Sequence, residues 1–251
     1  MISERDTMSG LAKGLAVIET FSAAKPRQSI AEVSAASGLD RATARRCLLT
    51  LANQGYADFD GKFFTLTPRV LRLGTACLAA MPLPQMVQPY LDRLSEELGE
   101  STSVAILDAD EIVYVARAVH RKVMSIALMP GSRLPAFCTS MGRVLLAALP
   151  VEEVRLRLKP ELRAMSLRTV TDPEAVLAIV AQTRAQGWCL NDQEVEIGLR
   201  SIAVPVVTAG GVTVAALNIG LPVRGEAAED VVKRYLPALM ALQTELRRLL
   251  P

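Results

Sequence analysis

The stretch Ser29–Gly55, SIAEVSAASGLDRATARRCLLTLANQG, carries the pattern that decides the fold. Ser29 is followed three residues later by Glu32, which is the signature of a capping box at the start of a helix. This helix is expected to run to about Ser37. Gly38 then ends it, because glycine readily adopts the left-handed conformation that terminates helices.

A second helix is predicted after a three-residue turn, with Asp40 as its N-cap and Gly55 beyond its last residue, Gln54. Two short helices joined in this way are typical of a helix-turn-helix motif. Apolar residues at helical spacing give the second helix one buried face, formed by Ala44, Cys47, Leu48 and Leu51. Its N-terminal, outward part is basic, as expected of a recognition helix. The predicted DNA-binding residues of the motif are Ser29, Arg41, Ala42, Thr43, Arg45 and Arg46.

A β-hairpin is predicted directly behind this helix. Asp60-Gly61 separates two strand-like runs, 56–58 and 62–66, and Asp-Gly suits the tight turns of hairpins. Helix-turn-helix plus hairpin predicts a winged helix, with Lys62 at the hairpin tip placed to contact a phosphate. A solvated basic surface without a partner is the simpler alternative for the arginines alone. The combination of short turn, arginine cluster and hairpin favours DNA binding.

Helices are also expected on both sides of this unit. Residues 9–23 form the first helix, with Ser9 as N-cap, and Pro68 starts a strongly apolar helix that ends near a group of prolines at 82, 84 and 89. We therefore predict three parts: a winged helix-turn-helix domain over 1–67, a linker helix over 68–83, and a second domain over 84–251. The apolar side chains of this linker helix need a surface that covers them, either in a second subunit of a dimer or within the same chain.

The remaining residues alternate between helical and strand-like patterns, which predicts an α+β domain. The expected helices are 85–98, 140–148, 151–158, 173–186 and 226–250. The expected strands are 102–107, 112–118, 123–128, 188–190, 201–207 and 212–219, with a loop over 132–139.

Polar residues interrupt three apolar stretches of this second domain. If a helix begins near Ser140, its free N–H groups make a site for a carboxylate, and Arg133 could pair with the same group. Asn218 stands alone in an apolar strand and needs a hydrogen-bonding partner. Together these stretches predict a small-molecule pocket. Its predicted residues are Arg133, Phe137, Ser140, Met141, Asn191, Glu194, Ser201 and Asn218.

Composition narrows the classes of function. The 251 residues include 28 Lys+Arg and 26 Asp+Glu, a net charge of +2, yet residues 1–80 alone carry 10 and 7, a net of +3. His120 is the single histidine, and the four cysteines form no CxxC, so no metal site and no cofactor is predicted. Ser140, Cys138 and His120 are the one conceivable nucleophile–base set, and an exposed loop suits His120 better. We expect a cytoplasmic protein that is not an enzyme and does not enter a membrane.

Four segments resemble the IclR family of bacterial transcription regulators: 11–21, 29–54, 135–147 and 192–205. Within the family, 113–117 and 131–147 are closest to regulators of protocatechuate, 4-hydroxybenzoate and β-ketoadipate-pathway genes. The resemblance implies a GAF-like effector-binding domain, a homodimer or dimer of dimers, operator DNA as partner and RNA polymerase as a further candidate. It also implies an effector site at Ser140, Met141, Asn191, Ser201 and Asn218, and a role in effector response for Arg133.

The resemblance predicts a regulator of aromatic-acid catabolism that senses a small aromatic carboxylate. Several family members have Asp, Cys or Ser where this chain has Asn191, Ser201 and Asn218, so a non-aromatic acid stays an alternative effector. A scaffold whose C-terminal domain only oligomerises is the second alternative. Activation and repression both remain open.

Overall fold

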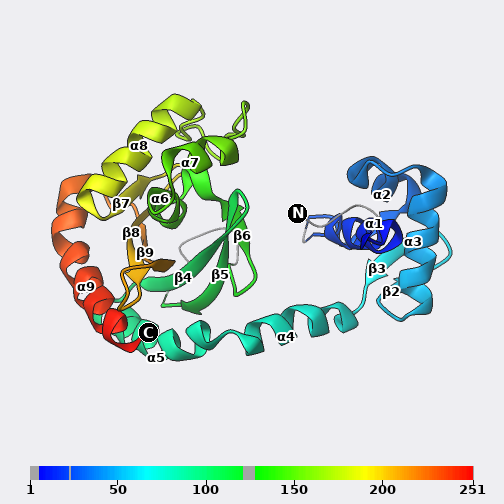
Figure 1. Cartoon of the computed structure of the whole chain (residues 1–251), viewed down its shortest axis with the longest axis horizontal. Helices are drawn as coiled ribbons and strands as arrows, with labels where there is room; N and C mark the ends of the chain where they lie inside the picture. Colours follow the sequence, from blue (N-terminus) through cyan, green and yellow to red (C-terminus); the bar gives the residue numbers. More distant parts are fainter. Residues whose placement is uncertain (1–5, 23, 121–127, 251) are drawn as a thin grey trace. The chain divides into compact units, whose positions relative to one another are not determined.

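The computed structural model describes residues 6–22, 24–120 and 128–250, and the chain divides into two compact units, 1–80 and 81–251 (Figure 1). Each unit has its own hydrophobic core.

The first unit is a winged helix-turn-helix, as predicted. Helices α1 (Ser9–Glu19), α2 (Ile30–Ser37) and α3 (Arg41–Asn53) pack over a small core that includes Val33 and Leu48. Ser29 and Glu32 form both hydrogen bonds of the capping box, and Gly38 is left-handed at φ 69°. The order of the antiparallel sheet is β1-β3-β2, with bounds β1 (Arg27–Ser29), β2 (Ala57–Phe59) and β3 (Phe63–Leu66).

Two local expectations for this unit were wrong, and one strand was not predicted. Met8, not Ser9, is the N-cap of α1. The helix ends at Glu19 rather than at residue 23, and the Thr20 hydroxyl donates back to the Val17 carbonyl at 2.8 Å. Strand β1 was not anticipated. It forms because the edge of β3 is free to pair, and the buried Gln28 side chain anchors it to the Thr20 carbonyl at 2.9 Å.

Pro68 begins a 3₁₀ turn, η2 (Pro68–Val70), that leads into α4 (Leu71–Ala80). The Thr67 hydroxyl accepts from the Arg69 N–H, and proline is tolerated here since its missing N–H would have no partner. The apolar side chains of Leu71 and Leu73 are 66% and 53% exposed. The described residues of the first unit therefore leave these apolar side chains of α4 uncovered.

The second unit is an α+β domain built on one antiparallel six-stranded sheet in the order β6-β5-β4-β9-β8-β7. The strands are β4 (Ser101–Asp108), β5 (Glu111–Ala118), β6 (Arg133–Pro135), β7 (Cys189–Asp192), β8 (Leu199–Val207) and β9 (Thr213–Pro222). Helices α5 (Pro82–Leu98) and α9 (Ala228–Leu249) cover one face. Helices α6 (Ser140–Ala147), α7 (Val151–Arg157) and α8 (Pro173–Gln186) form the layer on the other face (Figure 1). The sheet thus has a separate apolar core on each side.

Two predictions for this unit need correction. The segment 132–139 is not a plain loop: its residues 133–135 form edge strand β6 on β5, followed by a 3₁₀ turn, η3 (Ala136–Cys138). Helix α5 starts at Pro82 rather than at residue 85, because proline fits the first helical position, and Pro89 lies within the helix. The predicted strand 123–128 falls outside the described residues except for Leu128. In the part of the chain that the structure describes, no single helix is long and apolar enough to cross a membrane.

Candidate functional site

Helix α3 presents its basic side to solvent. Its N-cap Asp40 accepts a hydrogen bond from the Thr43 N–H at 2.9 Å, and this bond is the main cause that lowers the pKa of Asp40. Ala44 and Leu48 are fully buried, whereas Arg41, Arg45 and Arg46 are exposed. Among the described residues, none of these three arginines is in an ion pair. Their charge is therefore available to a polyanion.

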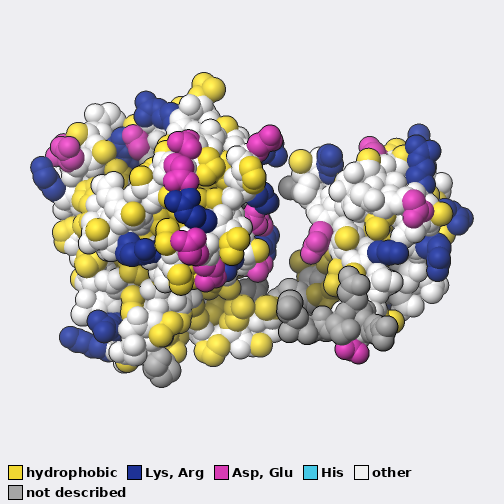
Figure 2. Space-filling view, turned by 45° about the horizontal axis from the view of Figure 1, so that its top comes forward, with side chains coloured by type: hydrophobic (Ala, Val, Ile, Leu, Met, Phe, Trp, Pro, Cys, Tyr) yellow, Lys and Arg dark blue, Asp and Glu magenta, His cyan; other side chains and the backbone are white. Residues whose placement is uncertain are grey.

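Of the predicted DNA-binding residues, five are exposed, namely Arg41, Ala42, Arg45, Arg46 and Lys62, whereas Ser29 and Thr43 are half-buried. Lys and Arg side chains stand out on the face of the first unit seen in Figure 2. Ala42 is exposed at the start of α3, and Lys62 is exposed at the hairpin tip. Ser29 is engaged in the capping box, where its hydroxyl donates to Glu32 at 2.6 Å, so its contribution is to fix the start of α2.

The wing tip is ordered by one carboxylate. Asp60 accepts from the Phe63 and Lys62 N–H groups at 2.8 and 2.9 Å and pairs with Arg27 at 2.5 Å. The bond from the Phe63 N–H is the largest cause holding the pKa of Asp60 well below its usual range. The guanidinium of Arg27 lies 4.2 Å from the centre of the Phe63 ring. The hairpin thus holds Lys62 on a defined turn.

A cavity lies in the second unit between the sheet and the start of α6. Its free volume is about 30 Å³, and the surrounding hollow, which includes space open to solvent, measures about 450 Å³. Its lining is Ser101, Tyr114, Arg117, Leu128, Leu134, Thr139, Ser140, Met141, Val195, Leu199, Ser201, Asn218 and Gly220.

Two neighbouring cross-strand rows of the sheet form the polar floor of this cavity, and all of their residues except Ser103 line it. The first row is Arg117, Ser103 and Asn218, which are paired across β5, β4 and β9. The second row lies two residues along the strands and is Ser101, Gly220 and Ser201. Residues two apart on a strand share a face, so both rows point to the same side. Gly220 leaves open space above this part of the sheet. A Cβ added there would meet no atom within 4 Å, so a side chain at this position would occupy space that is now empty.

Helix α6 closes the cavity with its N-terminus. Thr139 is its N-cap and accepts from the Gly142 N–H at 3.0 Å. The N–H groups of Ser140 and Met141 belong to the first turn and have no acceptor inside the helix. The Ser140 hydroxyl lies 2.8 Å from the Ser201 hydroxyl on β8. This end of the cavity therefore offers N–H and O–H donors to an anion.

The structure brings four of the eight predicted effector residues into the lining: Ser140, Met141, Ser201 and Asn218. Arg133 lies elsewhere. It sits on edge strand β6, 42% exposed, and pairs with Asp108 at 2.7 Å and Glu111 at 2.6 Å. Two carboxylates at the β4–β5 turn thus hold the group that was expected to bind the ligand.

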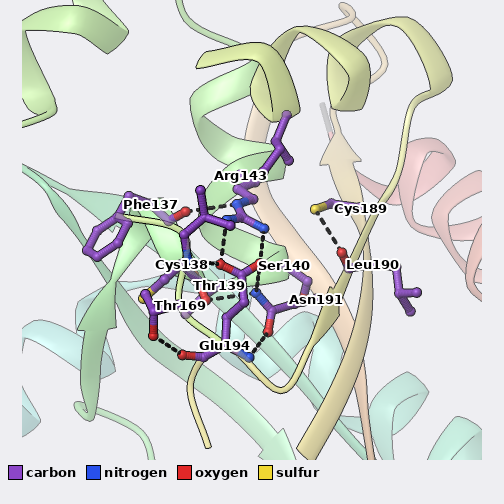
Figure 3. Close-up of polar contacts among 12 residues, drawn as sticks. Phe137, Cys138, Thr139, Ser140, Arg143, Thr169, Cys189, Leu190, Asn191 and Glu194 are labelled. Atoms are coloured by element: carbon purple, nitrogen blue, oxygen red, sulfur yellow. Dashed lines mark hydrogen bonds and ion pairs between the residues drawn. The ribbon is translucent and has the colours of Figure 1, made fainter. Parts of the chain in front are cut away.

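Phe137, Asn191 and Glu194 also lie outside the lining and instead surround Arg143 (Figure 3). The Arg143 side chain is 2% exposed, donates to the Phe137 carbonyl at 2.8 Å and forms two hydrogen bonds to the Glu194 carboxylate at 2.5 and 2.8 Å. Asn191 donates to the Cys138 carbonyl at 2.8 Å and to Glu194 at 3.2 Å. We call these four residues the Arg143 cluster. It fixes the turn that precedes α6 and so positions the cavity wall.

Sequence reasoning missed Tyr114 and Arg117. Strict alternation along β5 would place residues three apart on opposite faces. The register with β4 shifts between Val104 and Ala105, so that Val104 faces Ala116 and Ala105 faces Tyr114. The bulge leaves one extra residue in β5 and turns both Tyr114 and Arg117 toward the cavity. Burial raises the pKa of Tyr114 to about 12.

No group of three or more His, Cys, Asp or Glu side chains suited to a metal ion occurs within the described ranges. The donors of the cavity are hydroxyl, amide and guanidinium groups, which suit an organic acid.

The comparison with known families decides the identity of both units. Residues 10–61 match the IclR helix-turn-helix domain, and residues 75–246 match the bacterial transcriptional regulator IclR C-terminal domain. The chain belongs to the IclR family of transcriptional regulators. The family resemblance expected from the sequence is thereby confirmed, and so is its α+β fold with a winged N-terminal domain.

Relatives of this IclR-family chain include regulators of aromatic metabolism. The Pca regulon regulatory protein of Pseudomonas putida is 46% identical over 243 residues, which cover 96% of this chain and 84% of the relative. The p-hydroxybenzoate hydroxylase transcriptional activator of Acinetobacter baylyi is 36% identical, with 99% and 94% covered. An IclR homologue of Microbacterium hydrocarbonoxydans, solved as a complex with 4-hydroxybenzoate, is 28% identical with a TM-score of 0.74, and 96% and 100% are covered.

Proposed function

We propose that this IclR-family regulator binds operator DNA through α3 and the wing and responds to a small aromatic carboxylate in the cavity beside α6. The functional parts are the winged domain (1–67), the linker helix (68–83) and the effector domain (84–251). The observation that carries the proposal is the donor-rich end of the cavity, where the first turn of α6 meets Ser201. No catalytic step is assigned to any residue.

The lining of the cavity suits an aromatic acid. A carboxylate fits the free N–H groups of Ser140 and Met141, which the helix orients toward the cavity. Leu128, Leu134 and Val195 supply apolar surface for a ring. The names of the relatives, a Pca regulon regulator and a p-hydroxybenzoate hydroxylase activator, and the 4-hydroxybenzoate complex of a third support the same class of ligand.

A homodimer is part of the proposal. Helix α4 leaves Leu71 and Leu73 exposed, and α1 leaves Leu11 and Leu15 exposed at 63% and 46%. A second copy would cover such apolar side chains and supply a second recognition helix for a two-part operator. The ligand would change DNA binding only if it binds one arrangement of this dimer more tightly than another. Contact with RNA polymerase is a further proposed element of the response.

Calorimetric titration of the full chain tests the effector class. Protocatechuate and 4-hydroxybenzoate are expected to release or absorb heat saturably, whereas pyruvate, a non-aromatic acid, is expected to bind far more weakly. If pyruvate binds and no aromatic acid does, the aromatic assignment is wrong. If none binds, the effector role of the cavity is wrong. Turnover of any of these acids by the purified protein would contradict the absence of a catalytic step.

Selection from random DNA duplexes, followed by gel-shift titration, tests the DNA contacts. Arg46→Ala is expected to weaken binding of a selected duplex by roughly 1–3 kcal/mol if it contacts a base. Arg155→Ala, a change at an exposed arginine of the other unit, is the matched control. Equal affinity of the Arg46 variant and the control would remove Arg46 from the DNA-binding surface.

A further inference from the structure

Two polar atoms of the cavity lack a hydrogen-bonding partner among the described residues: Arg117 Nε and Asn218 Oδ1. Both are buried, and both residues line the cavity. They flank Ser103 in the first polar row of the floor, one on β5 and the other on β9. A donor and an acceptor are thus left open on the two strands that flank β4, on one face of the sheet.

Arg117 is a cation without an anion. Its Nη1 donates to the Ser103 hydroxyl at 2.8 Å, and within the described residues no carboxylate pairs with it. Burial lowers the pKa of Arg117, because removal from water disfavours the charged form. A half-buried guanidinium in this state is stabilised by any oxygen that accepts from its free N–H groups.

Asn218 provides the complementary group. The residue is 6% exposed, and its strand neighbours on either side, Leu217 and Ile219, are fully buried on the opposite face. An unpaired amide oxygen in such surroundings costs free energy unless a donor reaches it. The amide lines the cavity from β9, so a ligand in the cavity can supply the hydrogen-bond donor for Asn218 Oδ1.

We propose that Arg117 and Asn218 form a second polar subsite, which binds an oxygen substituent of the ligand other than the carboxylate held at α6. This inference rests on the proposed function and sharpens it. A ring hydroxyl satisfies both atoms, since its oxygen accepts from Arg117 and its hydrogen is donated to Asn218. A second carboxylate satisfies Arg117 by charge as well. The cavity therefore selects acids that carry two oxygen groups, with the apolar lining around the part between them.

The experiment is calorimetric titration of the full chain with five acids: benzoate, 4-methylbenzoate, 3-hydroxybenzoate, 4-hydroxybenzoate and terephthalate. 4-Methylbenzoate fills the space of a para substituent without its oxygen. We expect at least one acid with a second oxygen group to bind the native chain about tenfold or more tightly than 4-methylbenzoate, because the methyl group leaves both protein atoms unpaired. The hydroxybenzoates and terephthalate distinguish a hydroxyl from a second carboxylate as the preferred group.

Two variants test the residues. Arg117→Met and Asn218→Ala are each expected to reduce this preference to about twofold or less while the affinity for benzoate stays within about threefold of the native value. Arg155→Met, which removes an exposed arginine paired with Glu174, is expected to keep the preference. Thermal melting of each variant shows whether it folds, and either variant alone decides the question if the other does not.

Each outcome has one meaning. If benzoate and 4-methylbenzoate bind the native chain as tightly as the hydroxybenzoates and terephthalate, the second subsite is wrong while the proposed effector class stands. If Arg117→Met weakens all five acids equally, Arg117 holds the common carboxylate and the second subsite is again wrong. If none of the five acids binds the native chain, the proposed function itself fails and this inference fails with it.

Discussion

Arg143 on α6 and Glu194, 51 residues later, form a buried ion pair with two hydrogen bonds, at 2.5 and 2.8 Å. The Glu194 carboxylate also accepts from the Val170 N–H at 3.0 Å. Arg143 in turn donates to the Phe137 carbonyl. This ion pair thus joins three segments: the turn before α6, the segment before α8 and the connection from β7 to β8. It thereby fixes the start of α6, which forms one wall of the cavity.

Glu194→Gln is expected to destabilise the full chain by about 3–5 kcal/mol, because it leaves the Arg143 guanidinium buried beside a neutral amide. Urea unfolding followed by circular dichroism measures this change. Glu174→Gln removes one partner of an exposed pair with Arg155 and is expected to cost less than about 1 kcal/mol. Equal costs for the two variants would contradict the structural role given to the Arg143 cluster.

Gly142→Ala is expected to destabilise the chain by about 1–3 kcal/mol and to weaken ligand binding. A Cβ at this position would overlap the Ala136 carbonyl and Cα, which are backbone atoms and cannot rotate away. Relief of the overlap must shift the first turn of α6, whose N–H groups face the cavity. Calorimetry and thermal melting measure both effects. Gly74→Ala, at a position with open space on α4, is the control. A similar loss of stability and ligand binding in that variant would contradict the steric explanation.

The winged domain could be predicted from sequence because its signals are local. Ser29, Gly38, Asp40 and Gly61 each fix a cap or turn within three residues of themselves, and the structure has all four in the expected roles. Strand β1 could not be predicted in this way. Its three residues pair with β3, 38 positions away at Arg27 and Thr65, and carry no periodic pattern of their own.

Four of the eight predicted effector residues line the cavity: Ser140, Met141, Ser201 and Asn218. Ser140 and Met141 start a helix that the sequence marks, so their place in the lining followed. Arg133 was expected to bind the ligand but lies outside the lining, whereas Arg117, which lines the cavity, was not predicted. Sequence showed a cation near the turn but not the two carboxylates that pair with Arg133, nor the β5 bulge that turns Arg117 inward.

Arg133→Met is therefore expected to change the affinity for 4-hydroxybenzoate by less than about threefold, because its guanidinium is held outside the lining by an exposed pair of carboxylates. Arg117→Met is the comparison variant. Calorimetry of both with the same ligand decides which arginine the ligand contacts. A loss of binding confined to Arg133→Met would restore the assignment based on the family resemblance.

Gly220→Ala is expected to weaken binding of an aromatic acid about threefold or more without lowering the melting temperature. The new methyl group meets no protein atom within 4 Å and projects between Ser101 and Ser201 into the cavity. Replacement of glycine inside a strand also removes chain entropy from the unfolded state, which favours folding. Calorimetry and thermal melting separate the two effects. Unchanged affinity would show that the ligand does not approach this part of the floor.

The buried thiols give the stability of the chain a defined dependence on alkaline pH. Burial raises the pKa of Cys138 from 9.0 to about 12 and raises that of Cys189 in the same direction. Between pH 9 and 12 the folded chain keeps the Cys138 proton while the unfolded chain releases it, so this contribution to stability is complete below pH 9 and falls as pH rises.

Cys138→Ala is therefore expected to lose less stability between pH 8 and pH 10 than the native chain, measured by urea unfolding at each pH. Cys77→Ala, which changes an exposed thiol, is the control and is expected to follow the native chain. Parallel curves for all three proteins would show that the Cys138 thiol ionises equally in the folded and unfolded chains.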